Sequence, residues 1–139
     1  MTVLKLLSPV SAWRLLQDRQ DAVLVDVRSG AEYFFVGHPA GAANVPWMDE
    51  PHWRVNPDFS REVRHTLRAL RPGQPTETIP VLLICRSGVR SLAAAQALLV
   101  DGFQDVYNIA HGFEGEIDAQ HHRSTVNGWR FEGLPWEQC

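Results

Sequence analysis

The residues best suited to chemistry lie in the stretch CRSGVRS, residues 85 to 91, directly after the apolar run VLLI. A cysteine thiolate is a nucleophile, and Gly88 allows a turn tight enough for several backbone N–H groups to point toward one place. Those N–H groups, the N-terminus of the helix expected next and two arginine side chains all favour a thiolate. The spacing predicts that Cys85 is a nucleophile in an anion cradle formed by Arg86, Ser87, Gly88, Val89, Arg90 and Ser91.

A cysteine that follows a buried strand can also be a small, inert core residue. Such a residue would need neither Gly88, nor flanking arginines, nor a helix that begins within a few residues, so the reactive interpretation is favoured. Arg86 and Arg90 are expected to contact the negative charge of a substrate rather than to be ordinary solvated arginines.

Several elements must position this loop. Residues 80 to 84 and 105 to 109 have the pattern of strands, and residues 91 to 100 have that of a helix, which together make a βαβ unit. Residues 22 to 28 are apolar on both faces, as in a strand inside a largely parallel sheet. Ligands of such sheets bind beyond the carboxyl ends of the strands, where Cys85 is expected.

Weaker patterns indicate the rest of the fold. We expect a helix from residue 9 to about residue 21 and another from residue 58 to residue 71. A short helix near residues 30 to 35 and a brief strand near residues 43 to 45 lie between them. The sequence thus predicts an α/β fold with a central, mainly parallel sheet of about five strands and helices on both faces.

The composition is that of an ordinary globular domain, with 139 residues of which 45% are hydrophobic and 21% charged. We expect one domain over residues 1 to 139, with a core from about 8 to 115 and an aromatic tail from 116 to 139 that packs back on it. A net charge of −3 and scattered basic residues argue against nucleic-acid binding, and no apolar run is long enough to span a membrane. The expected location is the cytoplasm, where the two cysteines remain free thiols.

Three motifs together resemble a single-domain rhodanese, a family of sulfurtransferases. They are VDVRSGAEY at residues 25 to 33, GHPAGAANVP at residues 37 to 46, and CRSGVRS. The resemblance covers about residues 8 to 115, and the ending GWRFEGLPW is similar to the tail of many bacterial members. The positions that match are Asp26, Arg28, Glu32, Gly37, His38, Gly41, Ala42, Asn44, Cys85, Gly88 and Arg90.

The resemblance implies a rhodanese-type, thiosulfate:cyanide sulfurtransferase-like enzyme that needs no cofactor. Cys85 would take a sulfane sulfur from an anionic donor, either thiosulfate or a low-molecular-weight persulfide. The Cys85 persulfide would then pass that sulfur to a thiophilic acceptor, which could be a thiol, cyanide or a protein. Because thiolate and persulfide are both anions, one ring of N–H groups can stabilise both states.

The motifs depart from the family pattern at several places. Many members that use thiosulfate carry a lysine where this chain has Ser87, and a threonine or serine where it has Arg90, which weakens the case for thiosulfate. The usual Gly-His-Ile-Pro-Gly-Ala is replaced by Gly-His-Pro-Ala-Gly-Ala, and the common Gly-Gly after the last strand by His111-Gly112. Neither of these two changes affects the nucleophile, and we assign no role to His111.

Asp26, Arg28 and Glu32 are expected to support the site. An Arg28–Glu32 ion pair at i, i+4 would be worth only a few tenths of a kcal/mol if exposed, so its value would lie in orienting the loop.

The histidines form no recognisable metal site, since His121-His122 are adjacent and the remaining candidates lack ligand spacing; these are His38, His52 and His65. No metal is therefore expected. Cys139 is expected to be a frayed terminal residue rather than a resolving thiol. Trp47 and Trp53 are expected to pack in the protein, with the border of the pocket as the alternative.

Two other functions fit parts of the pattern. Cysteine phosphatases and arsenate reductases also place a thiolate at a helix start, but the phosphatase loop has five residues between cysteine and arginine, whereas this one has four. A non-catalytic rhodanese-like module, for protein interaction or sulfur carriage, remains the stronger alternative, although such modules frequently lose the cysteine.

Overall fold

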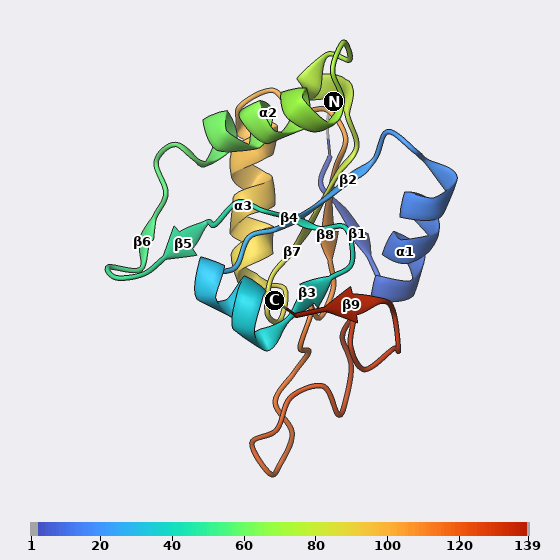
Figure 1. Cartoon of the computed structure of the whole chain (residues 1–139), viewed down its shortest axis with the longest axis vertical. Helices are drawn as coiled ribbons and strands as arrows, with labels where there is room; N and C mark the ends of the chain where they lie inside the picture. The colour runs from blue at the N-terminus through green and yellow to red at the C-terminus, as the bar shows by residue number, and fades with distance from the viewer. Residues whose placement is uncertain (1–2, 139) are drawn as a thin grey trace.

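A parallel sheet of five strands forms the centre of the computed structural model, which describes residues 3–138 (Figure 1). Along the chain these strands are β1 Lys5–Leu7, β2 Val23–Asp26, β4 Ala43–Asn44, β7 Val81–Ile84 and β8 Val106–Ile109. In the sheet their order is β1-β8-β7-β2-β4. The carboxyl end of the central strand, β7, leads directly into Cys85.

Three α-helices of the described residues cover the sheet, and they are α1 Pro9–Asp18, α2 Phe59–Leu70 and α3 Val89–Val100. Helix α1 begins where the Ser8 hydroxyl accepts a hydrogen bond from the Ser11 N–H at 3.1 Å, and Pro9 suits the first helical position. Helix α3 joins the parallel strands β7 and β8 and completes the βαβ unit that the sequence predicts.

Shorter elements connect these parts. They are the π-helix η1 Glu32–Val36, the 3₁₀-helix η2 Thr76–Thr78, and the antiparallel strand pairs β3 His38–Pro39 with β9 Trp136–Glu137 and β5 Met48–Asp49 with β6 Arg54–Val55. In Figure 1 the chain after β8, drawn in orange, extends below the sheet before it returns through β9. This segment therefore lies beyond the carboxyl ends of the parallel strands, on the same side as Cys85.

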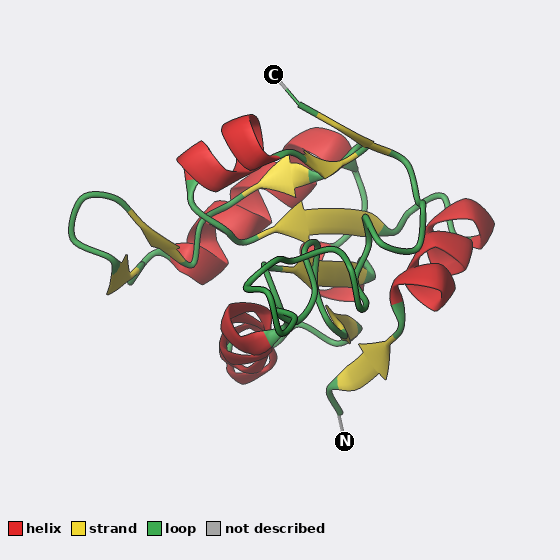
Figure 2. Cartoon of the chain, turned by 90° about the horizontal axis from the view of Figure 1, so that it is seen from below, coloured by secondary structure: helices red, strands yellow, loops and turns green. Residues whose placement is uncertain are grey.

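Apolar side chains cover both faces of the sheet. Figure 2 shows helices on either side of it. On one face, β2 and β7 pack against α2 and α3. On the other face, the same strands pack against α1 and against Phe113 and Trp129 from the chain after β8. Because successive strand residues point to opposite faces, a strand that is covered on both sides is apolar throughout.

The predicted fold class is confirmed, while several boundaries differ. The sequence pattern does not reveal β1, because this strand has only three residues, two of them exposed, and pairs only with β8 along one edge. Helix α3 begins at Val89, two residues earlier than predicted, because Gly88 turns into it with a left-handed backbone. Helix α1 ends at Asp18 rather than near residue 21.

The aromatic residues near the C-terminus differ in burial. Trp129 is fully buried, meets Trp13 edge to face and donates its ring N–H to the Pro135 carbonyl at 2.8 Å. Phe131 and Trp136 are 48% and 41% exposed, so the expected packing of the tail rests mainly on Trp129. Within residues 3–138, no helix has the length and apolar character needed to cross a bilayer.

Candidate active site

Cys85 is the central residue of the candidate site. It directly follows β7, its side chain is buried, and its thiol is free. The backbone N–H of Gly88 donates to the Cys85 sulfur at 3.0 Å, and the Ser91 hydroxyl oxygen lies 3.3 Å from that sulfur. A φ of 104° at Gly88 makes this turn possible, because side-chain-bearing residues rarely adopt such a value. The sulfur is thus held at the N-terminus of α3, where the helix dipole favours negative charge.

The six residues of the predicted cradle are not equivalent. Ser91 is fully buried beneath the sulfur, whereas Arg86 is exposed and Val89 is 75% exposed at the start of the helix. Within the described residues, the sulfur has hydrogen bonds with the Gly88 N–H and the Ser91 hydroxyl and with no other group of the loop. The other four residues belong to the same loop or to the first turn of α3.

The segment after β8 holds the cysteine loop in place from outside. Phe113 donates its N–H to the Cys85 carbonyl at 2.8 Å, and Glu114 donates to the Arg86 carbonyl at 3.0 Å. This close approach requires a glycine at position 112, since a Cβ there would lie 2.6 Å from the Arg86 oxygen. His111 replaces the other glycine of the family pattern, and it is exposed with a left-handed φ of 66°.

An ion pair joins η1 to the start of α3. Arg90 donates from its two terminal nitrogens to the two carboxylate oxygens of Glu32, at 2.7 and 2.9 Å. Burial alone would raise the pKa of Glu32, but the hydrogen bonds and charge of Arg90 and the hydrogen bonds from Ser29 lower it to about 2. The same pair raises the pKa of Arg90 above its ordinary value, chiefly through the hydrogen bonds to Glu32.

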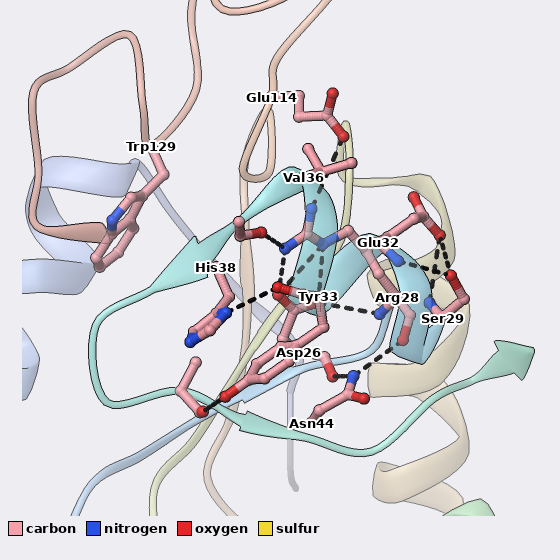
Figure 3. A network of polar contacts seen from close by, with 12 residues as sticks. Asp26, Arg28, Ser29, Glu32, Tyr33, Val36, His38, Asn44, Glu114 and Trp129 are labelled. Carbon is pink, nitrogen blue, oxygen red and sulfur yellow. Dashed lines mark hydrogen bonds and ion pairs between the residues drawn. The ribbon is translucent and has the colours of Figure 1, made fainter. Parts of the chain in front are cut away.

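This pairing corrects an expectation from the sequence, because Glu32 is not paired with Arg28. Ser29 and Glu32 form the reciprocal hydrogen bonds of a capping box, which turns the carboxylate toward α3 (Figure 3). Arg90, which is expected from sequence to meet substrate charge, thus already has a carboxylate partner. The spacing of three between Ser29 and Glu32 is the sequence signal that could have indicated this arrangement.

Arg28 is instead buried completely in the interior. Its guanidinium donates to Asp26 at 2.6 Å and to the Gly37 carbonyl (Figure 3). It also lies over the ring of Phe113. The remaining nitrogen, Nη1, has no hydrogen-bond partner within the described residues and lies 3.7 Å from Glu114. Asp26 and Arg28 are two residues apart and therefore point to the same side of the chain. This buried pair joins β2, the chain before β3 and the segment after β8.

Other residues singled out from the sequence have structural contacts. His38 stacks on Tyr33 with ring centroids 3.7 Å apart and donates to the Tyr33 carbonyl at 2.8 Å. Trp47 meets Phe59 edge to face in the core, whereas Trp53 is 44% exposed. Asn44 donates to the Asp26 and Arg28 carbonyls, both at 3.0 Å.

The candidate metal ligands of the sequence do not gather into one cluster in the part of the chain that the structure describes. Residues 3–138 contain no group of three or more His, Cys, Asp or Glu side chains that could hold a metal ion. Cys139 lies outside the described residues, so its predicted fraying stays a prediction.

One buried polar residue near the sulfur was not identified from the sequence. Asn108 of β8 is 4% exposed, and its side chain contacts both Gly88 and Ser91 of the cysteine loop. A polar residue within the otherwise apolar strand VYNI was the available signal.

Comparison with known proteins places this site in a family context. A model of the rhodanese-like domain matches residues 8–117. The thiosulfate sulfurtransferase GlpE of Actinobacillus pleuropneumoniae is 30% identical over 131 residues, which cover 94% of this chain and 91% of that protein.

Solved structures show the same fold. The crystal structure of Rv0390 from M. tuberculosis has 38% sequence identity and a TM-score of 0.81, and the match covers 100% of both chains. The polysulfide-sulfur transferase homodimer from Wolinella succinogenes has 24% identity and a TM-score of 0.57, with 98% of this chain and 80% of that chain covered. At that identity the second likeness concerns the fold alone.

Proposed function

The chain belongs to the rhodanese-like domain family, and on that premise we propose that it transfers a sulfane sulfur through a persulfide on Cys85. The observation that carries the proposal is the placement of a buried, free thiol at the N-terminus of α3, with the Gly88 N–H aimed at its sulfur at 3.0 Å. An N–H in this position stabilises the negative charge of the attacking thiolate.

The first step uses an anionic donor, thiosulfate or a low-molecular-weight persulfide. The Cys85 thiolate attacks the outer sulfur of the donor, and a sulfur–sulfur bond forms while the donor's own bond to that sulfur breaks. With thiosulfate, sulfite leaves with the bonding electron pair. Arg86, which is exposed and directly follows Cys85, is the residue best placed to attract the donor, because Arg90 is neutralised by Glu32.

The second step unloads the persulfide. The acceptor, a thiolate or cyanide, attacks the terminal sulfur, and the electron pair of the broken sulfur–sulfur bond returns to Cys85 as a thiolate. The negative charge thus moves by one bond, from the Cys85 sulfur to the terminal sulfur on loading and back again on unloading.

A phosphatase function is the less favoured alternative. Four residues separate Cys85 from Arg90, and the Arg90 guanidinium is bound to Glu32 at 2.7 and 2.9 Å rather than free for a phosphate. A protein of similar fold from Rhodopseudomonas palustris is described as a possible tyrosine phosphatase, but at 22% identity this likeness concerns the fold alone.

The proposal is tested by intact-protein mass spectrometry on reduced protein mixed in parallel with thiosulfate and with glutathione persulfide. We expect a mass gain of about 32 Da, one sulfur atom, that cyanide removes. The gain should persist in Cys139→Ser and disappear in Cys85→Ala. Turnover of an aryl phosphate without any sulfur adduct would contradict the proposal, and the absence of both activities would favour the non-catalytic module.

A further inference from the structure

Asn108 is a buried polar residue that contacts the cysteine loop from the neighbouring strand. It is the third residue of β8 and is 4% exposed. Its amide nitrogen donates to the Gly88 carbonyl at 3.3 Å, and its amide oxygen lies 2.5 Å from the Ser91 hydroxyl oxygen. Because a carbonyl only accepts hydrogen bonds, the contact with Gly88 determines which end of the amide faces Ser91.

Ser91 has one hydroxyl proton and two neighbours that could receive it. The Asn108 amide oxygen is at 2.5 Å, and the Cys85 sulfur is at 3.3 Å. The amide oxygen has no proton of its own, so the Ser91 proton must lie on the short contact with Asn108. Ser91 then presents a lone pair to the sulfur.

This arrangement suits a thiol and opposes a thiolate. A Cys85 S–H can donate to Ser91, which continues a chain of hydrogen bonds to Asn108. When the sulfur loses its proton to solvent, Ser91 can donate to it only by turning away from Asn108. That rotation would leave the buried amide oxygen without a donor, which is costly.

We propose that Asn108 is a positioning residue that acts through Ser91 to disfavour the free thiolate of Cys85. The Gly88 N–H remains directed at the sulfur in either state, so the thiolate is restrained rather than excluded. The restraint comes from one proton that cannot serve two acceptors.

A consequence follows for sulfur transfer, and it rests on the proposed function. In a persulfide, the Cys85 sulfur is bonded to a second sulfur and carries neither proton nor full charge. Ser91 can then keep its proton on Asn108 at no cost. Asn108 would therefore favour the loaded protein over the free thiolate and thereby retain the sulfur until an acceptor arrives.

Other charged groups surround the loop and must be held constant in a test. Arg86 and Arg90 belong to the loop and to α3, and Glu32 of η1 neutralises Arg90. The Asp26–Arg28 pair lies at the end of β2, and Glu114 and His111 follow β8. Variants at positions 91 and 108 change none of these charges.

The test measures the pH midpoint of thiolate formation by ultraviolet absorbance in a Cys139→Ser background, where Cys85 is the single thiol. Ser91→Ala, Asn108→Leu and the double variant complete a double-mutant cycle. With Ser91 present, Asn108→Leu should favour the thiolate about tenfold more than it does in the Ser91→Ala background, since one hydrogen bond to a charged sulfur is gained. The comparison removes any effect of losing the contact with Gly88.

An equal or smaller effect of Asn108→Leu in the presence of Ser91 would overturn the proposal. Ser91→Ala alone gives a second test that does not depend on how well the leucine is accommodated. It should leave the midpoint unchanged or move it slightly to lower pH, because the thiol loses an acceptor while the thiolate loses no donor. A shift of about one unit to higher pH would show that Ser91 donates to the thiolate and would also refute the proposal.

Sulfur loading is read separately by mass spectrometry at equilibrium with thiosulfate and sulfite. At a pH above the midpoint of thiolate formation, Asn108→Leu should lower the ratio of persulfide to free protein about tenfold in the Cys139→Ser background. If no protein loads sulfur at all, the proposed function fails, while the absorbance cycle still decides the role of Asn108.

Discussion

The Glu32–Arg90 ion pair connects η1 with the helix that begins at the cysteine loop, and Glu32→Gln tests it with little change of shape. The substitution keeps an acceptor for Ser29 and for one Arg90 nitrogen but removes the negative charge. We expect the variant to be less stable near neutral pH, by an amount that disappears in acid.

The magnitude follows from the pKa of Glu32, which is about 2 in the folded protein against an ordinary 4.5. A difference of this size corresponds to about 3 kcal/mol at about 1.4 kcal/mol per unit. Each side chain of the pair is 20% exposed, and solvent screening reduces the expected contribution to about 1 to 2 kcal/mol. For a chain of this length the melting temperature should fall by about 3 to 8 °C.

The pH dependence has a defined sign. Because folding lowers the pKa of Glu32, its contribution is complete above 4.5 and is lost as the pH falls toward about 2. Urea unfolding of wild type and Glu32→Gln at several pH values should therefore give two free-energy curves that converge below 4.5. Glu132→Gln, at an exposed position, is the matched control and should leave the curve nearly unchanged.

Two results would refute this reasoning. One is an unfolding free energy of Glu32→Gln equal to that of wild type at neutral pH, which would mean that the pair contributes nothing measurable. The other is a deficit that stays constant through the acid range, which would assign the loss to packing around the π-helix rather than to the charge of Glu32.

Three further substitutions test other parts of the structure. Arg28→Met should destabilise the protein by about 3 to 5 kcal/mol in urea unfolding, because it leaves the buried Asp26 carboxylate uncompensated; a loss under about 1 kcal/mol would contradict this. Trp129→Ala should cost about 3 to 5 kcal/mol by the same measurement, since a fully buried indole is replaced by a cavity beside α1. Gly112→Ala should slow alkylation of Cys85 by iodoacetamide, because the new methyl group would push on the Arg86 carbonyl and displace the loop. Gly73→Ala is the control: its left-handed glycine is in open space and far from the loop in sequence, so this variant should leave the alkylation rate unchanged.

Much of the fold could be predicted because its signals are local. Strands β2 and β7 are apolar throughout since both of their faces are covered, and Gly88 marks the point where the chain turns into α3. The same local order places Cys85 at the carboxyl end of a parallel strand, where open α/β sheets bind ligands. The predicted resemblance to rhodaneses is confirmed by the family match.

The partners of the charged and polar groups could not be predicted in the same way. Arg90 and Glu32 are 58 positions apart, and only the packing of η1 beside α3 brings them together. A pair at i, i+4, such as Arg28 and Glu32, was the nearest choice along the chain, but Arg28 is directed inward with Asp26. Spacing along the chain indicates contacts within one element, whereas the Glu32–Arg90 pair joins two elements and depends on how they pack.

The contacts of the sulfur show the same division. Residue types alone identify Cys85 as a nucleophile, because a thiol, a glycine and a helix start in that order have a direct chemical interpretation. That Asn108 of β8 competes for the proton of Ser91 depends on the register of two neighbouring strands and on a helix packed across them. Hydrogen-bond geometry is sensitive to fractions of an ångström, and only the assembled sheet sets distances that finely.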